Sequence, residues 1–129
     1  MDETGPLSAD DALAMLRARL PSYSFSTEPL GHGEDATIIS LCEPDGSASL
    51  WNLIVWERYE MLFSFGSGRL RAELEGTAED VEWCAMLVLA TSAGHFVHES
   101  HRLRDRLAVT LADGTVARFS TMPGTPRAG

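Results

Sequence analysis

The sequence contains no lysine, and all ten of its basic residues are arginine. GC-rich codon usage is the simpler explanation for this bias, but the chemical consequence holds either way. Without a lysine amine, the chain can form neither a Schiff base with a carbonyl substrate nor the phosphate-binding lysine of a P-loop. Both classes of chemistry are therefore excluded.

Cysteines and long apolar runs are also scarce. The two cysteines, Cys42 and Cys84, lie among apolar neighbours in different predicted elements and form no Cys-x-x-Cys pair. This placement favours two reduced core thiols. The first residues, MDETGPLSADD, lack the apolar run of a signal peptide, and the longest apolar run is too short to cross a bilayer. The sequence therefore predicts a cytoplasmic protein.

Acidic residues outnumber basic ones by 19 to 10, which gives a formal net charge of -9. Such a surface repels phosphate backbones and anionic lipids. We therefore expect neither nucleic acid nor a membrane as a partner. A basic protein or a cation is favoured instead.

The length of 129 residues fits one domain, spanning residues 1–129, that can bury a core without metal or disulfide. A first helix is predicted to open at Ser8 and to end before Pro21. A second is predicted over residues 77–94, where Thr77 begins the helix, an uncharged middle follows, and Gly94 ends it. Because this second helix is apolar on nearly every side, it should be the buried centre of the domain.

Alternating and apolar runs bounded by turn residues predict strands around the two helices. They cover residues 23–27, 36–43, 49–56, 59–65 and 69–75 before the central helix, and 103–112 and 115–121 after it. Asp113-Gly114 between the last two is a strong hairpin signal. The predicted fold class is α+β, an antiparallel sheet (a meander plus a C-terminal hairpin) packed against the buried central helix and the N-terminal helix. Residues 1–7 and 122–129 are expected to be a disordered arm and tail.

The strand at residues 49–56 is apolar on both faces. Trp51, Leu53 and Val55 alternate with Leu50, Ile54 and Trp56. Either the N-terminal helix covers the second face, or the sheet exposes an apolar patch centred on Trp56. The first arrangement is the usual one, and it is the one we expect.

Chemistry concentrates after the central helix, where three of the four histidines fall within seven residues. On a continued helix, His95, His98 and Glu99 would share one face and could hold a divalent metal, with His101 nearby. The spacing departs from the metalloprotease signature His-Glu-x-x-His by one residue. A solvated helix end is therefore the simpler interpretation, and no cofactor is expected.

Acidic and aromatic residues suggest a binding surface near the third and fourth strands. Aromatic anchors ringed by charge are typical of interfaces that steer a basic partner. No acidic pair has a spacing that requires general acid–base catalysis. The candidate binding residues are Trp51, Trp56, Glu57, Tyr59, Glu60, Glu34 and Asp35.

The order of these elements also resembles a known class of proteins. A strand containing tryptophan, LWNLIVWERYE, is followed by an aromatic strand, MLFSFGSGRLR, and by a helix after TAED. Over residues 50–93 this organisation is similar to that of the small immunity proteins carried beside bacterial polymorphic toxins. The resemblance implies an acidic single domain that binds and blocks a toxin domain, and it carries over no site residue.

The sequence therefore predicts a non-enzymatic protein-binding module, with an immunity or inhibitor protein against a basic toxin or effector domain as its specific form. One alternative is a metal-dependent enzyme or metal sensor that uses the cluster at residues 95–101. Another is a secretion chaperone or homo-oligomeric subunit whose apolar sheet face is covered by a second copy.

Overall fold

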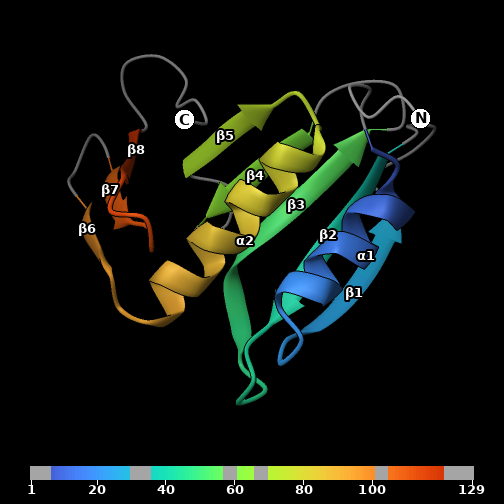
Figure 1. Cartoon of the computed structure of the whole chain (residues 1–129), viewed down its shortest axis with the longest axis horizontal. Coiled ribbons are helices and arrows are strands. Elements are labelled where there is room, and N and C mark those ends of the chain that lie inside the picture. Colours follow the sequence, from blue (N-terminus) through green and yellow to red (C-terminus); the bar gives the residue numbers. More distant parts are fainter. Residues whose placement is uncertain (1–6, 30–35, 57–60, 66–69, 101–104, 121–129) are drawn as a thin grey trace.

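The computed structural model describes residues 7–29, 36–56, 61–65, 70–100 and 105–120, and in them it has two helices and two antiparallel sheets (Figure 1). Five strands follow one another in sequence order as a meander, and three further strands form a separate sheet. The elements are α1 (Ala9–Arg19), β1 (Ser24–Pro29), β2 (Ala36–Cys42), β3 (Ala48–Trp56), β4 (Met61–Phe65), β5 (Leu70–Leu74), α2 (Ala78–Ser92), β6 (Phe96–Ser100), β7 (Asp105–Thr110) and β8 (Val116–Ser120). The predicted α+β class is confirmed.

Both helices begin at side-chain caps. The Ser8 hydroxyl accepts the backbone N–H of Asp11 at 3.1 Å, and the Thr77 hydroxyl accepts that of Asp80 at 3.2 Å. The Asp80 carboxylate also accepts the backbone N–H groups of Glu75 and Gly76 at 2.9 and 3.1 Å. The two capping bonds satisfy donors that a helix start otherwise leaves open, and the bonds to Asp80 hold the residues before Thr77 against the first turn of α2.

The start of the described chain is attached to the fold. The backbone N–H of Leu7 donates to the carbonyl of Gly76 at 2.9 Å. Leu7, which the arm predicted over residues 1–7 includes, is therefore held against the fold. The rest of that arm and the predicted tail at 122–129 lie outside the described residues.

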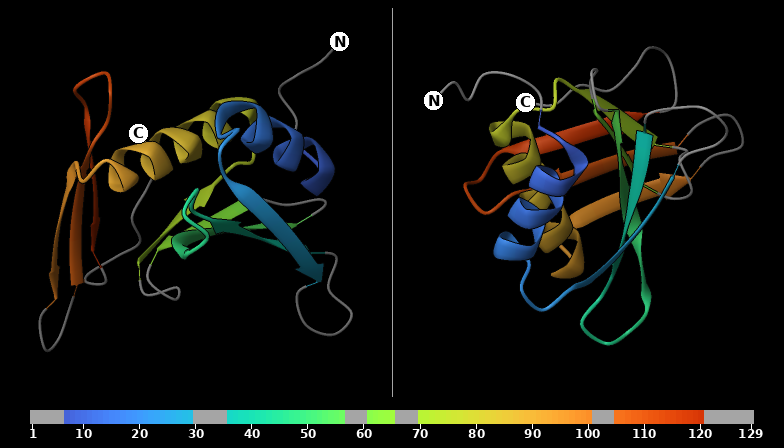
Figure 2. Two further views of the ribbon diagram at one scale, coloured as in Figure 1. Left: turned by 90° about the horizontal axis from the view of Figure 1, so that it is seen from below. Right: turned by 90° about the vertical axis from the view of Figure 1, so that its right-hand side faces the viewer.

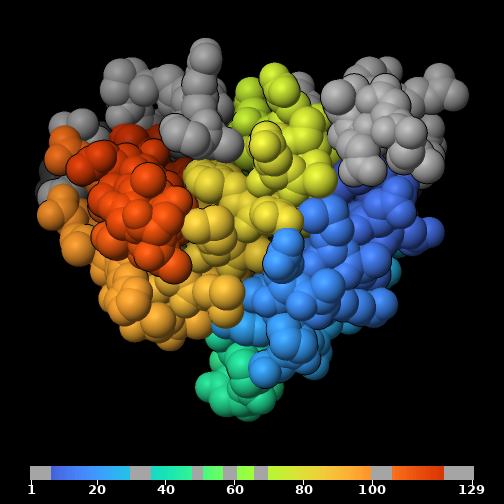
Figure 3. Space-filling view, in the orientation of Figure 1, coloured from blue at the N-terminus to red at the C-terminus, as the bar shows by residue number. Residues whose placement is uncertain are grey.

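Helix α2 lies between α1 and the three-stranded sheet (Figure 3). Its buried residues face the core, and they are Val81, Cys84, Ala85, Leu87, Val88 and Ala90. Leu89, on the opposite side, is 49% exposed. The helix is central, as predicted, but one strip of its apolar surface reaches solvent. No helix in the described residues is long and apolar enough to span a membrane.

The N-terminal helix does not cover the second face of β3, so that expectation is wrong. Helices α1 and α2 lie side by side on the same face of the five-stranded sheet (Figure 2), joined by an Arg19–Glu82 ion pair at 2.5 Å. The buried residues Ala12 and Leu16 of α1 belong to the same core as α2. The physical reason is width. Five strands at about 4.8 Å spacing span about 19 Å, while one helix covers only about 10 Å.

The three-stranded sheet contains a strand that the sequence did not predict. β6 pairs with β7, which in turn pairs with β8 through the predicted Asp113-Gly114 hairpin. Leu107, Val109 and Phe119 are buried on its inner face. The ring of Phe119 lies 5.9 Å from that of Trp51 and 6.0 Å from that of Trp83. These contacts join the second sheet to the main core.

Candidate functional site

The candidate site is the open face, by which we mean the face of the five-stranded sheet opposite α1 and α2. Its centre is an apolar row that runs across three neighbouring strands and consists of Ile38, Ile54 and Leu62. The same register places Glu28 beyond one end of this row, on β1, and Glu73 beyond the other, on β5. An apolar row with a carboxylate at each end therefore crosses the whole sheet.

The two faces of the sheet differ in burial. On the helix side, the corresponding row of Ile39, Leu53, Phe63 and Ala72 is 0% exposed. On the open face, Ile38, Ile54 and Leu62 are only half-buried, and Glu28 and Glu73 are exposed. A contiguous row of apolar side chains at a partly solvated sheet surface makes this face a candidate docking surface.

The neighbouring row on the open face is polar. It consists of Ser26, Ser40, Asn52, Ser64 and Arg71. The Ser64 hydroxyl donates to the amide oxygen of Asn52 at 2.6 Å, which explains how a hydroxyl that is only 4% exposed is satisfied. The open face is thus divided along the strands into an apolar half and a polar half.

Trp56 is the one predicted binding residue that the structure places on the open face. It is half-buried and lies opposite Ala36 in the register, beside the apolar row. The predicted alternation along β3 is confirmed, with Trp51, Leu53 and Val55 buried on the other side. Five further predicted residues lie outside the described residues: Glu34, Asp35, Glu57, Tyr59 and Glu60.

Trp51 belongs to the core, which removes it from the predicted binding surface. It is 2% exposed, and its ring stacks on Phe63 with centroids 4.5 Å apart. Its indole N–H donates to the Thr91 hydroxyl of α2 at 2.9 Å. The side chain is therefore used to join β3 to the helix above it, and a partner cannot reach it.

Of the apolar row and the carboxylates at its ends, four residues were missed by the sequence interpretation: Glu28, Ile38, Leu62 and Glu73. Glu73 lies within the predicted strand at residues 69–75, and Glu28 directly follows the predicted strand at residues 23–27. A usable signal was present at Ile38 and Ile39, because two adjacent isoleucines in one strand must point to opposite faces. That pattern already indicates a second apolar surface on β2.

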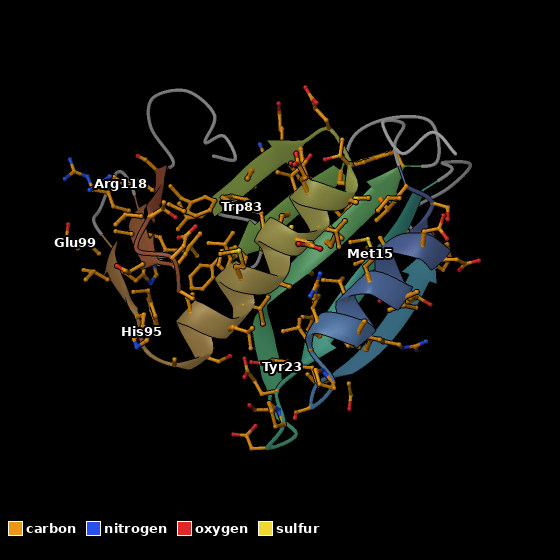
Figure 4. The ribbon with its side chains drawn as sticks, in the orientation of Figure 1. Met15, Tyr23, Trp83, His95, Glu99 and Arg118 are labelled. Carbon is orange, nitrogen blue, oxygen red and sulfur yellow. The ribbon has the colours of Figure 1, made fainter. Side chains whose placement is uncertain are left out.

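The histidine cluster does not share one helical face. Helix α2 ends at Ser92, Gly94 takes a positive φ of 83°, and strand β6 begins at Phe96. Successive residues of a strand point to opposite faces, so His98 and Glu99 are on different sides of β6. The His98 ring packs edge-on against Phe65 at 5.6 Å. Figure 4 places His95 before the strand and Glu99 farther along it.

A metal set would need these side chains to converge. Within the described residues, no group of three or more histidine, cysteine, aspartate or glutamate side chains could hold a metal ion. His101, the remaining member of the predicted cluster, lies outside that part of the chain.

The described groups with a shifted pKa lie away from the open face. Burial, followed by the nearby Glu43 carboxylate, raises the pKa of Tyr23, whose hydroxyl is hydrogen-bonded to Ser92. Ser92 in turn donates to Glu43 at 2.9 Å. This chain ties the end of α2 to the segments before β1 and after β2. Burial also raises the pKa of the Cys84 thiol well above its usual value, and the Asp80 carboxylate adds to this effect. These groups contribute to the architecture of the helix side.

Comparison with known proteins gives no relative from which a role could be carried over. No family model matches the chain, and no curated protein or solved structure matches it either.

Proposed function

We propose that this chain is a non-enzymatic protein-binding module that accepts a basic protein partner on the open face of its five-stranded sheet. The observation that carries the proposal is the apolar row Ile38–Ile54–Leu62 with Glu28 and Glu73 at its ends. A half-buried apolar centre provides the contact area, and the exposed carboxylates at its margins attract cationic side chains.

The charge of the whole chain supports the same partner. A net charge of -9 draws a basic protein toward the surface and repels a second copy of the chain. A face-to-face dimer would also bring the glutamate-flanked rows of both copies together, and like charges so close are unfavourable. These arguments favour a basic partner over the homo-oligomer.

An inhibitor or immunity protein that acts in the cytoplasm on a basic toxin or effector domain is the specific form of this proposal. It rests on the similarity of residues 50–93 to immunity proteins in the order of their elements. In such a protein, binding itself is the function, because covering the toxin's own surface is enough to block it. This form needs no catalytic group and no cofactor in the chain.

The test is affinity capture of protein partners by the wild-type chain and by variants of the open face. Ile54→Thr keeps a β-branched side chain in the strand but removes apolar contact, so we expect it to weaken binding about tenfold. The double change Glu28→Gln/Glu73→Gln removes two marginal charges and should weaken binding about two- to twentyfold. Leu89→Thr, at the exposed position on α2, is the matched control and should leave capture unchanged.

Salt provides an independent measurement on the captured pair. The Debye length falls from about 10 Å at 0.1 M salt to about 3 Å at 1 M, so binding should weaken steeply over this range. Capture of an acidic protein would overturn the proposal. The same holds if the affinity of the captured protein changes neither with salt nor in the Ile54 and glutamate variants. Circular dichroism must first establish that each variant keeps the wild-type fold.

A further inference from the structure

The spacing of the apolar row identifies the kind of element that fits it. The three side chains come from adjacent strands, so they stand about 4.8 Å apart and the row spans about 10 Å. On a helix, residues at i, i+3 and i+7 share one face and span about 10.5 Å. On an extended strand, same-face residues lie about 6.7 Å apart, so three of them span about 13 Å. A helix therefore matches the row within about 1 Å, and a strand misses it by about 3 Å.

The flanking carboxylates extend this match. Glu28 and Glu73 lie on β1 and β5, one strand beyond each end of the row, and are therefore about 19 Å apart. A helix that lies across the strands covers this length in about 13 residues. A cationic residue one turn beyond each outer apolar residue would then reach one of the two carboxylates. Both glutamates are exposed, so a cationic side chain of the partner can reach either carboxylate.

The helices of the chain itself do not have this charge pattern. Helix α1 carries Asp10 and Asp11 in its first turn, and α2 carries Glu79 and Asp80. Laid across the open face of another copy, either helix would bring its acidic end to a glutamate. The charge therefore points to a helix from a different protein, with cations at both ends of an apolar stripe.

We infer that the basic partner binds through an amphipathic helix laid across the five strands, with its apolar stripe on Ile38, Ile54 and Leu62 and a cationic residue on each of Glu28 and Glu73. This inference rests on the proposed function and names the element of the partner that carries it. This binding mode is similar to helix-in-groove recognition, with the open face in place of the groove.

The experiment uses designed peptides and the full chain. The first peptide is helical, with leucines at i, i+3 and i+7 and one arginine a turn beyond each outer leucine. The second peptide has the same number of arginines and leucines, but its leucines stand at every second position. One proline replaces a neutral residue, so this peptide stays extended. Fluorescence anisotropy of labelled peptide measures the affinity of each for the protein. We expect the helical peptide to bind at least tenfold more tightly than the extended one.

Variants of the protein locate the contact. Glu28→Gln and Glu73→Gln should each weaken the helical peptide about two- to fivefold. Glu79→Gln, which makes the same charge change in the first turn of α2, should leave its affinity unchanged and serves as the control. Ile54→Thr should weaken it about tenfold.

The outcomes separate the inference from the proposal on which it rests. Tighter binding of the extended peptide, weakened by the Ile54 and glutamate variants, would overturn the helix and leave the protein-binding module in place. Failure of both peptides to bind would also overturn the helix, while the capture experiment decides the module separately. Binding of the helical peptide that responds to Glu79→Gln as strongly as to Glu28→Gln would show a contact elsewhere and would overturn the inference.

Discussion

Replacement of Thr91 by valine is expected to lower the free energy of unfolding by about 1–2 kcal/mol, because a buried indole N–H loses its acceptor. The Thr91 hydroxyl lies 2.9 Å from the indole nitrogen of Trp51 and also donates within α2, to the carbonyl of Leu87 or Val88, each at 3.0 Å. Valine keeps the volume and has nearly the same helix propensity, so packing and helix formation change little. The loss therefore reports mainly on the hydrogen bond between β3 and α2.

A second variant isolates that bond. Trp51→Phe removes the indole N–H together with part of a ring that stacks on Phe63 at 4.5 Å and meets Phe65 and Phe119 edge-on at 4.8 and 5.9 Å. Because volume is lost from a tightly packed site, we expect this change to cost about 2–3 kcal/mol. In the double variant, the indole N–H that Thr91→Val would leave without an acceptor is already absent. Its total cost should therefore fall short of the sum of the single changes by about 1 kcal/mol.

Urea unfolding followed by far-UV circular dichroism at 25 °C measures all four proteins of this cycle. Thr110→Val, at an exposed position on β7, is the control and should change stability by less than about 0.5 kcal/mol. Equal stability of Thr91→Val and Thr110→Val, together with strictly additive single changes, would refute the role assigned to the Trp51–Thr91 bond.

Two further predictions follow from the side chains whose pKa is shifted. The Asp113 carboxylate accepts the backbone N–H and the hydroxyl of Thr115 at 3.0 and 2.6 Å, and these bonds lower its pKa below 3.8. A lowered folded-state pKa stabilises the fold above about 3.8 and loses that contribution as the pH falls through the folded value. The melting temperature of the wild type should thus exceed that of Asp113→Asn at pH 6 and approach it below pH 3.8, whereas a constant difference would count against this linkage. The Cys84 thiol is 0% exposed and has a raised pKa, so at pH 8 an alkylating reagent should modify it only on unfolding, as peptide mapping with Cys84→Ser as reference can establish. Native labelling of Cys84 as fast as that of the half-buried Cys42 would contradict its placement.

The parts of the fold that the sequence predicted are those that local chemistry decides. Thr77 and Ser8 start helices because their hydroxyls reach N–H groups three residues ahead. The predicted Asp113-Gly114 turn forms because the aspartate accepts the backbone N–H of the second residue after it, Thr115, at 3.0 Å, and Asp45 accepts that of Ser47 in the same way at 2.9 Å. Each of these signals involves partners within a few residues. A sequence pattern can therefore contain the whole interaction.

Strand β6 and the burial of Trp51 depend on partners outside the segments themselves. In β6, Val97 is 62% exposed and the last three residues, His98, Glu99 and Ser100, are polar, so the segment carries little apolar alternation. It is a strand because it pairs with β7 and because His98 packs on Phe65. Likewise, both faces of β3 are apolar, so the pattern alone could not decide which tryptophan enters the core. The position of α2 decided it, through the bond from Thr91 to Trp51.

The open face follows from the placement of α1 beside α2. Two helices are needed to cover one face of a sheet about 19 Å wide, and the described part of the chain has two, so the open face, with its apolar and polar halves, is left without a helix. The charges are not spread evenly along the sequence. Residues 1–95 hold sixteen acidic residues and five arginines, whereas residues 96–129 hold three and five. The negative potential is therefore concentrated in the part of the chain that builds the five-stranded sheet and its helices. The basic partner proposed above would be drawn toward this part of the chain and away from the three-stranded sheet, which carries Arg106 and Arg118. Removal of the arginines at 106 and 118 should therefore raise the rate of association with such a partner slightly, while removal of Glu28 and Glu73 should lower it.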